Sequence, residues 1–513
     1  MMNKKQFPKG IQTFSDIRNG DYYYVDKTPY ILAMLKEKYI FLSRPRRFGK
    51  SLTLSTIDEL FRGNKALFTG LYAEQHWQWD KNYPIIRLNF ALNLTFDSEY
   101  LQQSLSEQLS NLERQFGMTA IHQTLSGRFN DLIETVATQH QSQVVILVDE
   151  YDKPILDNLT NKDEAIKVRD KLRDFYGVIK GADKYIRFAM LTGVSKFSKV
   201  NLFSGLNNLT DITLEPEYSA LCGYTQAELE SVFAPELDGV DLNEVKRWYN
   251  GYNWTGESVY NPYDILLFLS SSQKMFKPYW FETGSATFLM DMLANHQLDM
   301  TVIKNSLTTD IALSRFDVGD ISPIALMFQT GYLTIDKVLQ LPFGVNYTLK
   351  FPNIEVQQTL NHLVLEKYAH LDDSFINHHK NPLYMSFLND DLPLMVETVT
   401  SFFAGIPYHW HSNNNIAHFE GYWASVFYAY FASIGLHIHV EEPTKNGRMD
   451  MTVIFANRVY IFEFKVINNK VQAGSALAQI KAKNYAQKYQ GFGQVYEIGV
   501  EFDEHSRDIT FEF

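Results

Sequence analysis

The fold is decided by the stretch Arg44-Pro45-Arg46-Arg47-Phe48-Gly49-Lys50-Ser51. A short apolar run at residues 39–42 precedes it, and a helix-like segment at residues 52–60 follows it. Strand, tight turn, Gly-Lys-Ser and helix is the order that a phosphate-binding loop requires. The backbone N–H groups and the dipole at the start of a helix both favour an anion there. The stretch therefore predicts a phosphate-binding loop.

The residues of this loop have separate expected roles. Lys50 would reach the β- and γ-phosphates, and the Ser51 hydroxyl would ligate Mg²⁺. The rest of the expected nucleotide-binding stretch is Arg46, Arg47, Phe48 and Gly49.

The loop also departs from the general pattern G-x-x-x-x-G-K-[ST], because Arg44 stands at the first glycine position. Either this residue accepts the turn with its Cβ, or the loop begins with a different shape. The loop arginines either meet phosphates or pair with acidic groups of a neighbouring domain. An ordinary turn with a solvated lysine is the alternative to a phosphate site.

A second signature lies downstream, where residues 143–152 form a β-branched run that ends in acids. Such a run predicts a strand buried on both faces, which is typical of a parallel sheet. Asp149 would hold the Mg²⁺ hydration shell, and Glu150 would polarise the attacking water. Acids that merely cap a strand at the surface are the alternative. The Gly-Lys-Ser turn upstream favours the nucleotide site.

Two further strands are predicted at residues 84–90 and 185–191, with a long helix-like stretch at 98–140 between them. Strands that alternate with helices indicate a parallel α/β sheet with right-handed crossovers. Thr192 and Ser195 follow the strand at 185–191, where a polar residue can sense the γ-phosphate. The aromatic segment 21–30 either packs and caps a helix or forms a wall of the base site, and we favour packing.

Composition limits the class of protein. The chain has 513 residues, 45% of them hydrophobic, which suggests two to four globular domains. Its formal charge of −12 argues against a protein that coats nucleic acid non-specifically. One cysteine, Cys222, excludes a disulfide framework. We see no signal peptide and no apolar run long enough to cross a membrane, and we expect a cytoplasmic protein.

The middle of the chain, about residues 215–340, is expected to be mainly helical, with Thr225 and Glu228 as a capping box. Its aromatic-rich turns include residues 248–254 and 260–263. Aromatic side chains interleaved with Asn and Gly either stack on nucleic-acid bases or lock a small helical lid together. We favour the lid.

A second candidate site lies near the end of the chain. Residues 449–455 and 459–466 predict two strands joined at 456–458, preceded by a loop at 441–448. Alternation places Glu463 and Lys465 on one face, and Asp450 can lie beside Glu463 across the hairpin. Two carboxylates suit Mg²⁺ or Mn²⁺, and Lys465 could orient a water activated by the metal. Charged pairs on exposed strands are common, but apolar neighbours favour a functional site here.

Segments 24–28, 44–51, 148–152 and 191–195 together resemble the bacterial AAA-ATPase-like family, whose members often carry a C-terminal PD-(D/E)XK nuclease-type domain. That family's own loop resembles this one, so Arg44 is compatible with nucleotide binding. The resemblance implies an α/β multidomain protein. Its parts would be a P-loop core at 5–210, a helical, lid-like or winged-helix-like domain at 211–340, a connecting region at 341–410 and a nuclease-like domain at 411–513.

The resemblance also implies roles for residues of the last domain. Asp450 and Glu463 match the metal-binding positions, and Lys465 matches the catalytic lysine. Glu420 and Gln479 match supporting positions, with Glu441 as an alternative to Glu420.

We therefore expect an ATP-binding and ATP-hydrolysing protein with a Mg²⁺-dependent nuclease domain that acts on nucleic acid, DNA rather than RNA. A homo-oligomer is compatible with this expectation. One alternative is a nucleotide-switched interaction protein whose nuclease-like domain binds without cutting. Another is a small-molecule kinase, which leaves the last hundred residues without a role.

Overall fold

The computed structural model describes residues 4–91, 97–197, 202, 206, 208–279, 307–314, 316, 318–342, 344–406, 420–468, 471–503, 506 and 508–513. These residues form two compact units. The first ends at Glu355, and the second contains Val356–Phe513. Each unit is built around a five-stranded sheet. The division falls inside the stretch 341–410 that the sequence assigns to a connecting region.

The sheet of the first unit has the order β2-β3-β4-β1-β5, and all its pairings are parallel. Its strands are β1 (Tyr39–Ser43), β2 (Ile85–Asn89), β3 (Val144–Asp149), β4 (Ile186–Gly193) and β5 (Thr210–Asp211). Every residue of β1 and β3 is buried, as their continuous apolar runs predict. The sheet confirms the expected parallel α/β architecture.

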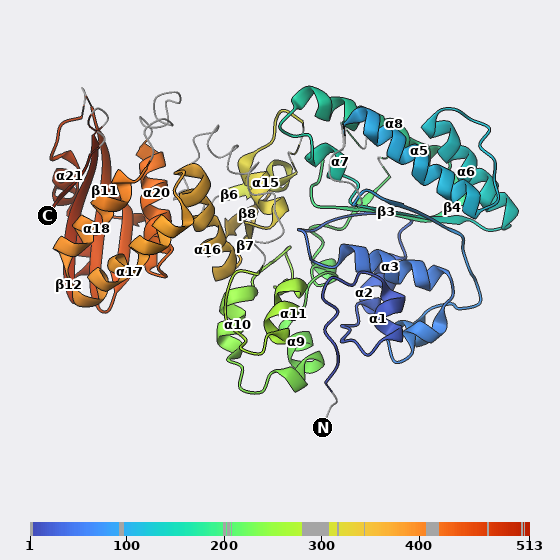
Figure 1. Cartoon of the computed structure of the whole chain (residues 1–513), viewed down its shortest axis with the longest axis horizontal. Helices are drawn as coiled ribbons and strands as arrows, with labels where there is room; N and C mark the ends of the chain where they lie inside the picture. Colours follow the sequence, from blue (N-terminus) through green and yellow to red (C-terminus); the bar gives the residue numbers. More distant parts are fainter. Residues whose placement is uncertain are drawn as a thin grey trace. The chain divides into compact units, whose positions relative to one another are not determined.

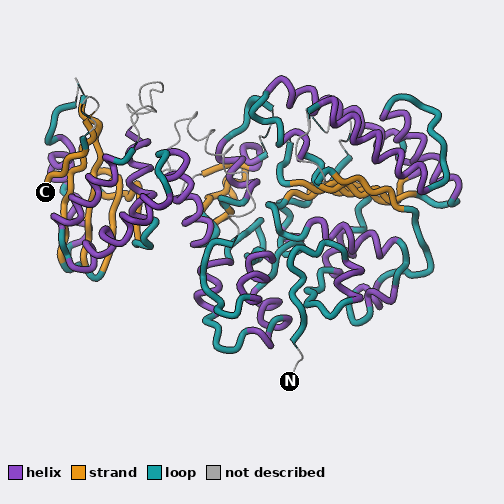
Figure 2. Tube along the Cα trace, viewed as in Figure 1, coloured by secondary structure: helices purple, strands orange, loops and turns teal. Residues whose placement is uncertain are grey.

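Helices cover both faces of this sheet (Figures 1 and 2). One face carries α1 (Phe14–Asn19), α2 (Thr28–Met34) and α3 (Lys50–Phe61), and the other carries α5 (Ser98–Gln115), α6 (Leu125–Gln139) and α8 (Lys162–Gly181). Shorter segments connect these elements: η1 (Lys65–Phe68), α4 (Ala73–His76), α7 (Lys153–Leu156) and η2 (Asp183–Tyr185).

The strand order determines where the polar strand ends meet. Because β4 lies between β1 and β3, the carboxyl end of β4 separates the phosphate-loop strand from the acidic strand. Leu42 of β1 pairs with Thr192 of β4, and Val148 of β3 pairs with Leu191. The loop, Thr192 and Asp149 are therefore brought to one edge of the sheet.

The later part of the first unit contains a helical cluster and a small antiparallel sheet. Its helical segments are η3 (Pro216–Tyr218), α9 (Gln226–Val232), η4 (Ala234–Glu236), α10 (Leu242–Tyr249), α11 (Pro262–Ser270), α14 (Asp310–Leu313) and α15 (Pro323–Thr330). The capping box of Thr225 and Glu228 begins α9, as predicted.

The small sheet consists of β6 (Leu307–Thr309), β7 (Thr334–Leu341) and β8 (Gly344–Lys350). All of β6 and all but the last residue of β7 fall within the stretch that the sequence predicts as mainly helical. Half of the residues of β7 are exposed, so it lacks the buried apolar run that would have indicated a strand.

The sheet of the second unit has the order β13-β12-β11-β10-β9, in which only β11 and β12 pair in parallel. Its strands are β9 (His437–Thr444), β10 (Gly447–Phe455), β11 (Arg458–Ile467), β12 (Gln494–Asp503) and β13 (Ile509–Glu512). Its helical segments, with α16 beginning at the boundary, are α16 (Ile354–Leu363), η6 (Val364–Tyr368), α17 (Asp373–Asn389), α18 (Leu392–Ala404), α20 (Glu420–Ala432), α21 (Ser475–Lys483) and η8 (Tyr485–Tyr489).

The prediction of a loop at residues 441–448 is wrong, because β9 continues to Thr444 and pairs with β10. Pro443 lies in this strand, which is compatible with pairing because β9 is at the edge of the sheet. The two faces of β11 differ as alternation predicts. Phe462 and Phe464 pack against Phe427 of α20, whereas Glu463 contacts α21 on the other face.

Candidate functional sites

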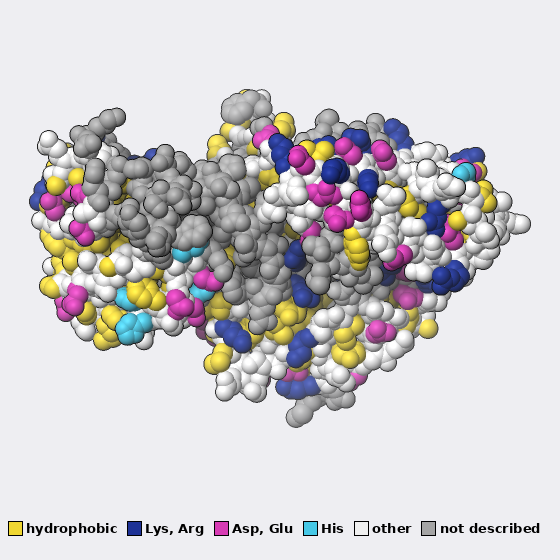
Figure 3. Space-filling model, turned by 45° about the horizontal axis from the view of Figure 1, so that its top comes forward, with side chains coloured by type: hydrophobic (Ala, Val, Ile, Leu, Met, Phe, Trp, Pro, Cys, Tyr) yellow, Lys and Arg dark blue, Asp and Glu magenta, His cyan; other side chains and the backbone are white. Residues whose placement is uncertain are grey.

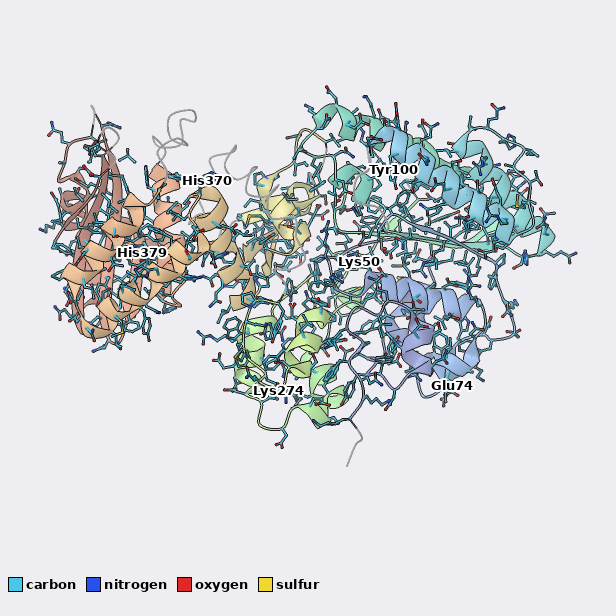
Figure 4. All side chains as sticks on the ribbon, viewed as in Figure 1. Lys50, Glu74, Tyr100, Lys274, His370 and His379 are labelled. Atoms are coloured by element: carbon cyan, nitrogen blue, oxygen red, sulfur yellow. The ribbon has the colours of Figure 1, made fainter. Side chains whose placement is uncertain are left out.

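The loop after β1 turns directly into α3, and Lys50 is the first residue of that helix (Figure 4). Gly49 precedes the helix with a φ of 93°, a conformation that glycine adopts without a steric cost. Arg47 also has a positive φ, 68°, which strains a residue with a Cβ. Phe48 is buried, and its ring packs against Tyr252 and Trp254 at centroid distances of 4.7 and 5.3 Å. The loop is thus supported from below by aromatic side chains.

Arg44, at the position of the missing glycine, turns away from the site. It is only 1% exposed and donates hydrogen bonds to the carbonyls of Ser43, Thr213 and Tyr218 at 2.8–3.1 Å. Its guanidinium also lies 4.2 Å from the centre of a Trp254 ring. Burial lowers the pKa of Arg44 to about 10. The expectation that the loop arginines meet phosphates or acids is therefore wrong for Arg44, which braces the loop instead.

A cavity of about 520 Å³ opens in front of the loop. Its polar wall includes Arg46, Arg47, Gly49, Lys50, Ser51 and Glu150. Its apolar wall includes Pro8, Ile11, Ile17, Tyr224 and Leu266. A volume of this size is in the range of small-molecule sites. Neither the segment 8–17 nor Leu266 was expected in this site, because apolar residues remote from a motif give no sequence signal.

The Lys50 ammonium is held over the loop. It donates hydrogen bonds to the carbonyls of Arg44 and Pro45 at 2.9 and 3.0 Å. Burial lowers the pKa of Lys50, while the nearby charges of Glu150 and Asp149 act in the opposite direction. A phosphate in the cavity would give this buried cation a charged partner.

Asp149 and Thr192 lie behind this cavity rather than in its wall. Both are buried, and the Thr192 hydroxyl donates to Oδ1 of Asp149 at 2.9 Å. The other oxygen, Oδ2, is buried and has no hydrogen-bond partner among the described residues. A carboxylate oxygen left open in this way, together with the Ser51 hydroxyl in the cavity wall, fits a Mg²⁺ ion, which prefers oxygen ligands.

Glu150 has the environment of a general base. It lines the cavity with a backbone φ of 52°, which is uncommon for a residue with a side chain. Burial raises the pKa of Glu150, the charge of Lys50 opposes this rise, and Asp149 adds to it. A carboxylate with a raised pKa accepts a proton from water more readily than an ordinary glutamate does.

Asp152 and Ser195 have structural roles. Oδ2 of Asp152 accepts hydrogen bonds from the backbone N–H groups of Val194 and Ser195 at 3.0 and 2.6 Å, and from the Ser195 hydroxyl at 2.5 Å. A Cβ at Gly193 would lie 2.5 Å from Oδ1 of Asp152, so only glycine fits there. These bonds fix the turn after β4. They also occupy the Ser195 hydroxyl, which the sequence made a candidate sensor of the γ-phosphate.

The aromatic segments serve packing, and Pro262 and Tyr263 also line the cavity. Lys27 Nζ donates to the Glu228 carboxylate at 2.6 and 2.7 Å and to the Ala220 carbonyl at 2.8 Å. No described residue of segment 21–30 lines the cavity. Tyr252 and Trp254 are buried against Phe48, and Tyr263 lies 4.8 Å from the Arg47 guanidinium. The turns at 248–254 and 260–263 therefore hold the loop in place.

In the second unit, four predicted residues converge between β10, β11 and α21. Glu463 is fully buried, and its Oε1 accepts a hydrogen bond from the Gln479 amide. Lys465 Nζ lies 3.6 Å from the same oxygen. The side chain of Asp450 reaches the strand between them, where its Oδ2 accepts from the backbone N–H of Phe464 at 2.8 Å.

Tyr485 lies within reach of the charge of this cluster, and Glu501 supports the helix that carries Gln479. Burial raises the pKa of Tyr485, and the charge of Glu463 adds to the rise. Glu501, on β12, accepts hydrogen bonds from the backbone N–H groups of Gly474 and Ala476, both at 3.0 Å. It therefore caps α21, the helix that carries Gln479. A single acid in a strand gives no sequence signal for such a role.

Two acids are predicted from the sequence to support this cluster, and the structure describes only their backbone. Glu420 begins α20 and Glu441 lies in β9, but both side chains are outside the described residues. Within the described part of the chain, no group of three or more His, Cys, Asp or Glu side chains is arranged to hold a metal. Asp450 and Glu463 thus supply two carboxylates.

Comparisons with known proteins assign a family to each of the two parts of the chain that carry a candidate site. Residues 8–203 match a family described as predicted AAA-ATPase, and residues 418–512 match the PD-(D/E)XK nuclease superfamily. An Azotobacter chroococcum mcd 1 protein named "Uncharacterized protein in vnfD 5'region" is 48% identical over 512 residues, which cover 99% of this chain and 98% of that protein. The chain belongs to the predicted AAA-ATPase family.

This AAA-ATPase-like chain carries its PD-(D/E)XK superfamily domain on the same polypeptide, so the resemblance seen in the sequence is confirmed at both ends. The family match to residues 8–203 contains the loop, Asp149, Glu150 and Thr192. The superfamily match contains Asp450, Glu463, Lys465 and Gln479. Among the helices of the described residues, none combines the length and the apolar character that a membrane span needs.

Proposed function

We propose that the first unit binds ATP with Mg²⁺ and hydrolyses it. The observation that carries this proposal is that Lys50, Ser51 and Glu150 line one cavity of about 520 Å³ at the start of α3. The phosphate charge would replace the carbonyl partners of Lys50. Arg46 and Arg47 in the same wall add positive charge beside the phosphates.

The residues divide the chemistry between them. The Asp149 carboxylate and the Ser51 hydroxyl would hold Mg²⁺, which when bound neutralises phosphate charge. Glu150 would orient the attacking water and accept its proton. Thr192 fixes the carboxylate of Asp149 through its hydrogen bond.

We propose further that the second unit hydrolyses phosphodiester bonds of nucleic acid, with DNA as the preferred substrate. The support is the convergence of Asp450, Glu463 and Lys465 on one short length of β11. The two carboxylates would bind Mg²⁺ or Mn²⁺, which when bound acidifies a water. Lys465 would orient that water, and Gln479 would hold Glu463 in place.

Both sites stand on one chain, and this motivates a coupling hypothesis in which ATP controls the cleavage of DNA. The experiment is cleavage of plasmid and linear DNA with Mg²⁺ or Mn²⁺, with and without ATP. Asp450→Ala should abolish cleavage and leave ATP hydrolysis intact. Lys50→Met should abolish ATP binding at the loop and remove any dependence of cleavage on ATP bound there. Cleavage that is identical in Lys50→Met and wild type, with and without ATP, would contradict the coupling.

A second candidate function has one observation in its favour. Because only two acids gather at the C-terminal site of the described residues, this domain could bind nucleic acid or a partner without cutting. ATP would then switch an interaction. No cleavage under any condition, with ATP still hydrolysed and DNA still bound, would support this candidate.

A further inference from the structure

The strand β4 contains a bulge at Arg187. Val144 of β3 pairs with Ile186, but the next residue, Val145, pairs with Phe188, so Arg187 is an extra residue without a partner in the register. Bulges are rare between parallel strands, and they redirect a side chain out of the regular alternation of faces. Ile186 and Phe188 are fully buried, whereas Arg187 is half-buried and lines a hollow.

This hollow has a volume of about 370 Å³, and its charged residues are all basic. Lys36, Lys81 and Arg187 line it, together with His76, Trp77 and Tyr83. No acidic residue of the described chain is among its lining residues. A purely basic hollow is unexpected in a chain with a formal charge of −12, and it favours an anionic ligand.

The three cations of the hollow lack acidic partners. In the part of the chain that the structure describes, the side chains of Lys36, Lys81 and Arg187 form no ion pair or hydrogen bond. Neighbouring cations, in contrast, form ion pairs. Lys38 lies 2.8 Å from Asp183, and Figure 3 shows basic and acidic side chains interspersed on the face of this unit that it draws. The bulge therefore directs Arg187 toward two other uncompensated cations.

The floor of the hollow is aromatic and rigid. The rings of Trp77 and Tyr83 both meet the ring of Phe61 edge-on, at 5.3 and 5.5 Å, and Phe61 stacks on Phe188 at 5.7 Å. The Trp77 indole N–H donates to the Leu60 carbonyl at 3.0 Å. Fixed aromatic rings beside cations suit a ligand that has a planar group as well as negative charge.

The hollow is separate from the ATP cavity. It lies toward the amino ends of β2 and β4, whereas the phosphate loop follows the carboxyl end of β1, and the two cavities share no lining residue. Helix α3 spans the distance between them, from Lys50 at the loop to Phe61 under the hollow, which is about 18 Å at 1.5 Å per residue.

We propose that this hollow is a second nucleotide site, which binds the phosphates of a nucleoside di- or triphosphate through Lys36, Lys81 and Arg187. The planar base would pack against Trp77 and Tyr83. The volume is in the range that small ligands occupy, and the three cations carry enough positive charge to balance a diphosphate and most of the charge of a triphosphate. The proposal requires no hydrolysis and is independent of the chemistry at the loop.

The test is the stoichiometry of ADP binding to the full chain, measured by equilibrium dialysis with Mg²⁺ at about 0.15 M salt, where non-specific charge attraction is screened. Wild type should bind two ADP per chain. Lys50→Met should retain one, the double variant Lys81→Gln and Arg187→Gln should retain one, and the combined triple variant should bind none. Lys65→Gln, which changes an exposed lysine elsewhere on this unit, should still bind two.

A second readout separates the hollow from a folding defect. ADP should change the tryptophan fluorescence of Lys50→Met, and the change should disappear when Trp77→Phe is added. Pyrophosphate should displace ADP from Lys50→Met. One ADP per chain in wild type, or two in the Lys81→Gln and Arg187→Gln variant, would overturn the proposal. So would displacement by single-stranded oligonucleotide but not by pyrophosphate, because the hollow would then belong to a nucleic-acid path.

Discussion

The Thr192 hydroxyl donates a hydrogen bond across 2.9 Å to Oδ1 of Asp149, joining the ends of two adjacent parallel strands. Neither group is exposed, so the bond is not exchanged with water. The bond occupies Oδ1 of Asp149. It leaves Oδ2 without a hydrogen-bond partner among the described residues. The strand order, with β4 between β1 and β3, is what allows a residue of β4 to set the orientation of the acid.

Replacing Thr192 by valine should lower ATP hydrolysis and leave ATP affinity nearly unchanged. Valine keeps the shape but not the hydroxyl, so Asp149 loses the bond that orients it. Removing a hydrogen-bond partner of a metal-binding carboxylate lowers activity by about 10–100-fold. Steady-state kinetics with ATP should show the change in kcat. Thr192→Ser retains a hydroxyl and should remain close to wild type, and equal rates for both variants would contradict the role.

Restoring the glycine of the general loop pattern by Arg44→Gly should destabilise the protein. The change removes three hydrogen bonds to buried carbonyls and the contact with Trp254. We expect a loss of about 3–5 kcal/mol in the free energy of unfolding. Urea unfolding of the full chain measures it. An unchanged midpoint would show that Arg44 does not brace the loop.

Arg47→Gly is the matched control, because the same substitution should act differently three positions later. Arg47 has a φ of 68°, so glycine relieves backbone strain, which offsets the lost contact with Tyr263, and stability should be maintained. Arg47 also lines the cavity, so ATP affinity should fall. Titration calorimetry with a non-hydrolysable ATP analogue would measure this loss of affinity. An unaltered affinity would show that Arg47 does not contribute to nucleotide binding.

A buried acid pair predicts a pH dependence of stability. Asp264 and Glu355 are both fully buried, and burial followed by the charge of Glu355 raises the pKa of Asp264 well above its usual range. A carboxyl whose pKa is higher in the folded chain takes up protons on folding. Its contribution to stability is therefore complete below the ordinary pKa, 3.8, and is lost as the pH rises toward the folded value.

Asp264→Asn removes this titration. The variant should have a Tm higher than wild type by about 2 °C or more at pH 8, with the difference vanishing near pH 4. Thermal unfolding followed across this range measures the effect. Asp80→Asn, which changes an exposed aspartate, should shift the Tm little at any pH. A Tm lowered equally at every pH would mean that Asp264 is needed for packing rather than held protonated.

Gln479→Ala should weaken metal binding at the C-terminal site. The amide of Gln479 is bonded to Glu463, and its loss allows this carboxylate to turn or take up a proton. We expect Mg²⁺-dependent cleavage to fall by about 10–100-fold, with partial recovery at high Mn²⁺. Lys481→Gln, on the same helix, is the control. Equal cleavage by both variants at every metal concentration would contradict the supporting role.

The sequence predicts those strands of both sheets whose position is determined by local composition. Continuous buried runs such as β3, and the hairpin of β10 and β11, appear in the sequence as they do in the structure, because burial on both faces requires apolar residues throughout. The pairing of Glu463 with Lys465 on one face follows from alternation alone. These features need no knowledge of distant residues.

Other features depend on partners far along the chain. Arg44 is held by Thr213, Tyr218 and Trp254, which no local pattern connects to it. Arg187 leaves the regular alternation through a bulge, and the edge strand β9 has acids and a proline that indicate a loop. In each case tertiary contacts decide the structure against the local sequence signal.

The aromatic support under Phe48 has a consequence for how this protein can be divided. Tyr252 and Trp254 lie about two hundred residues beyond the loop that they support, outside the family match that ends at residue 203. A fragment cut at that limit would keep every motif of the nucleotide site and lose the floor on which the loop rests. We therefore expect that the smallest fragment with a properly supported loop is larger than the fragment that carries the ATPase signature.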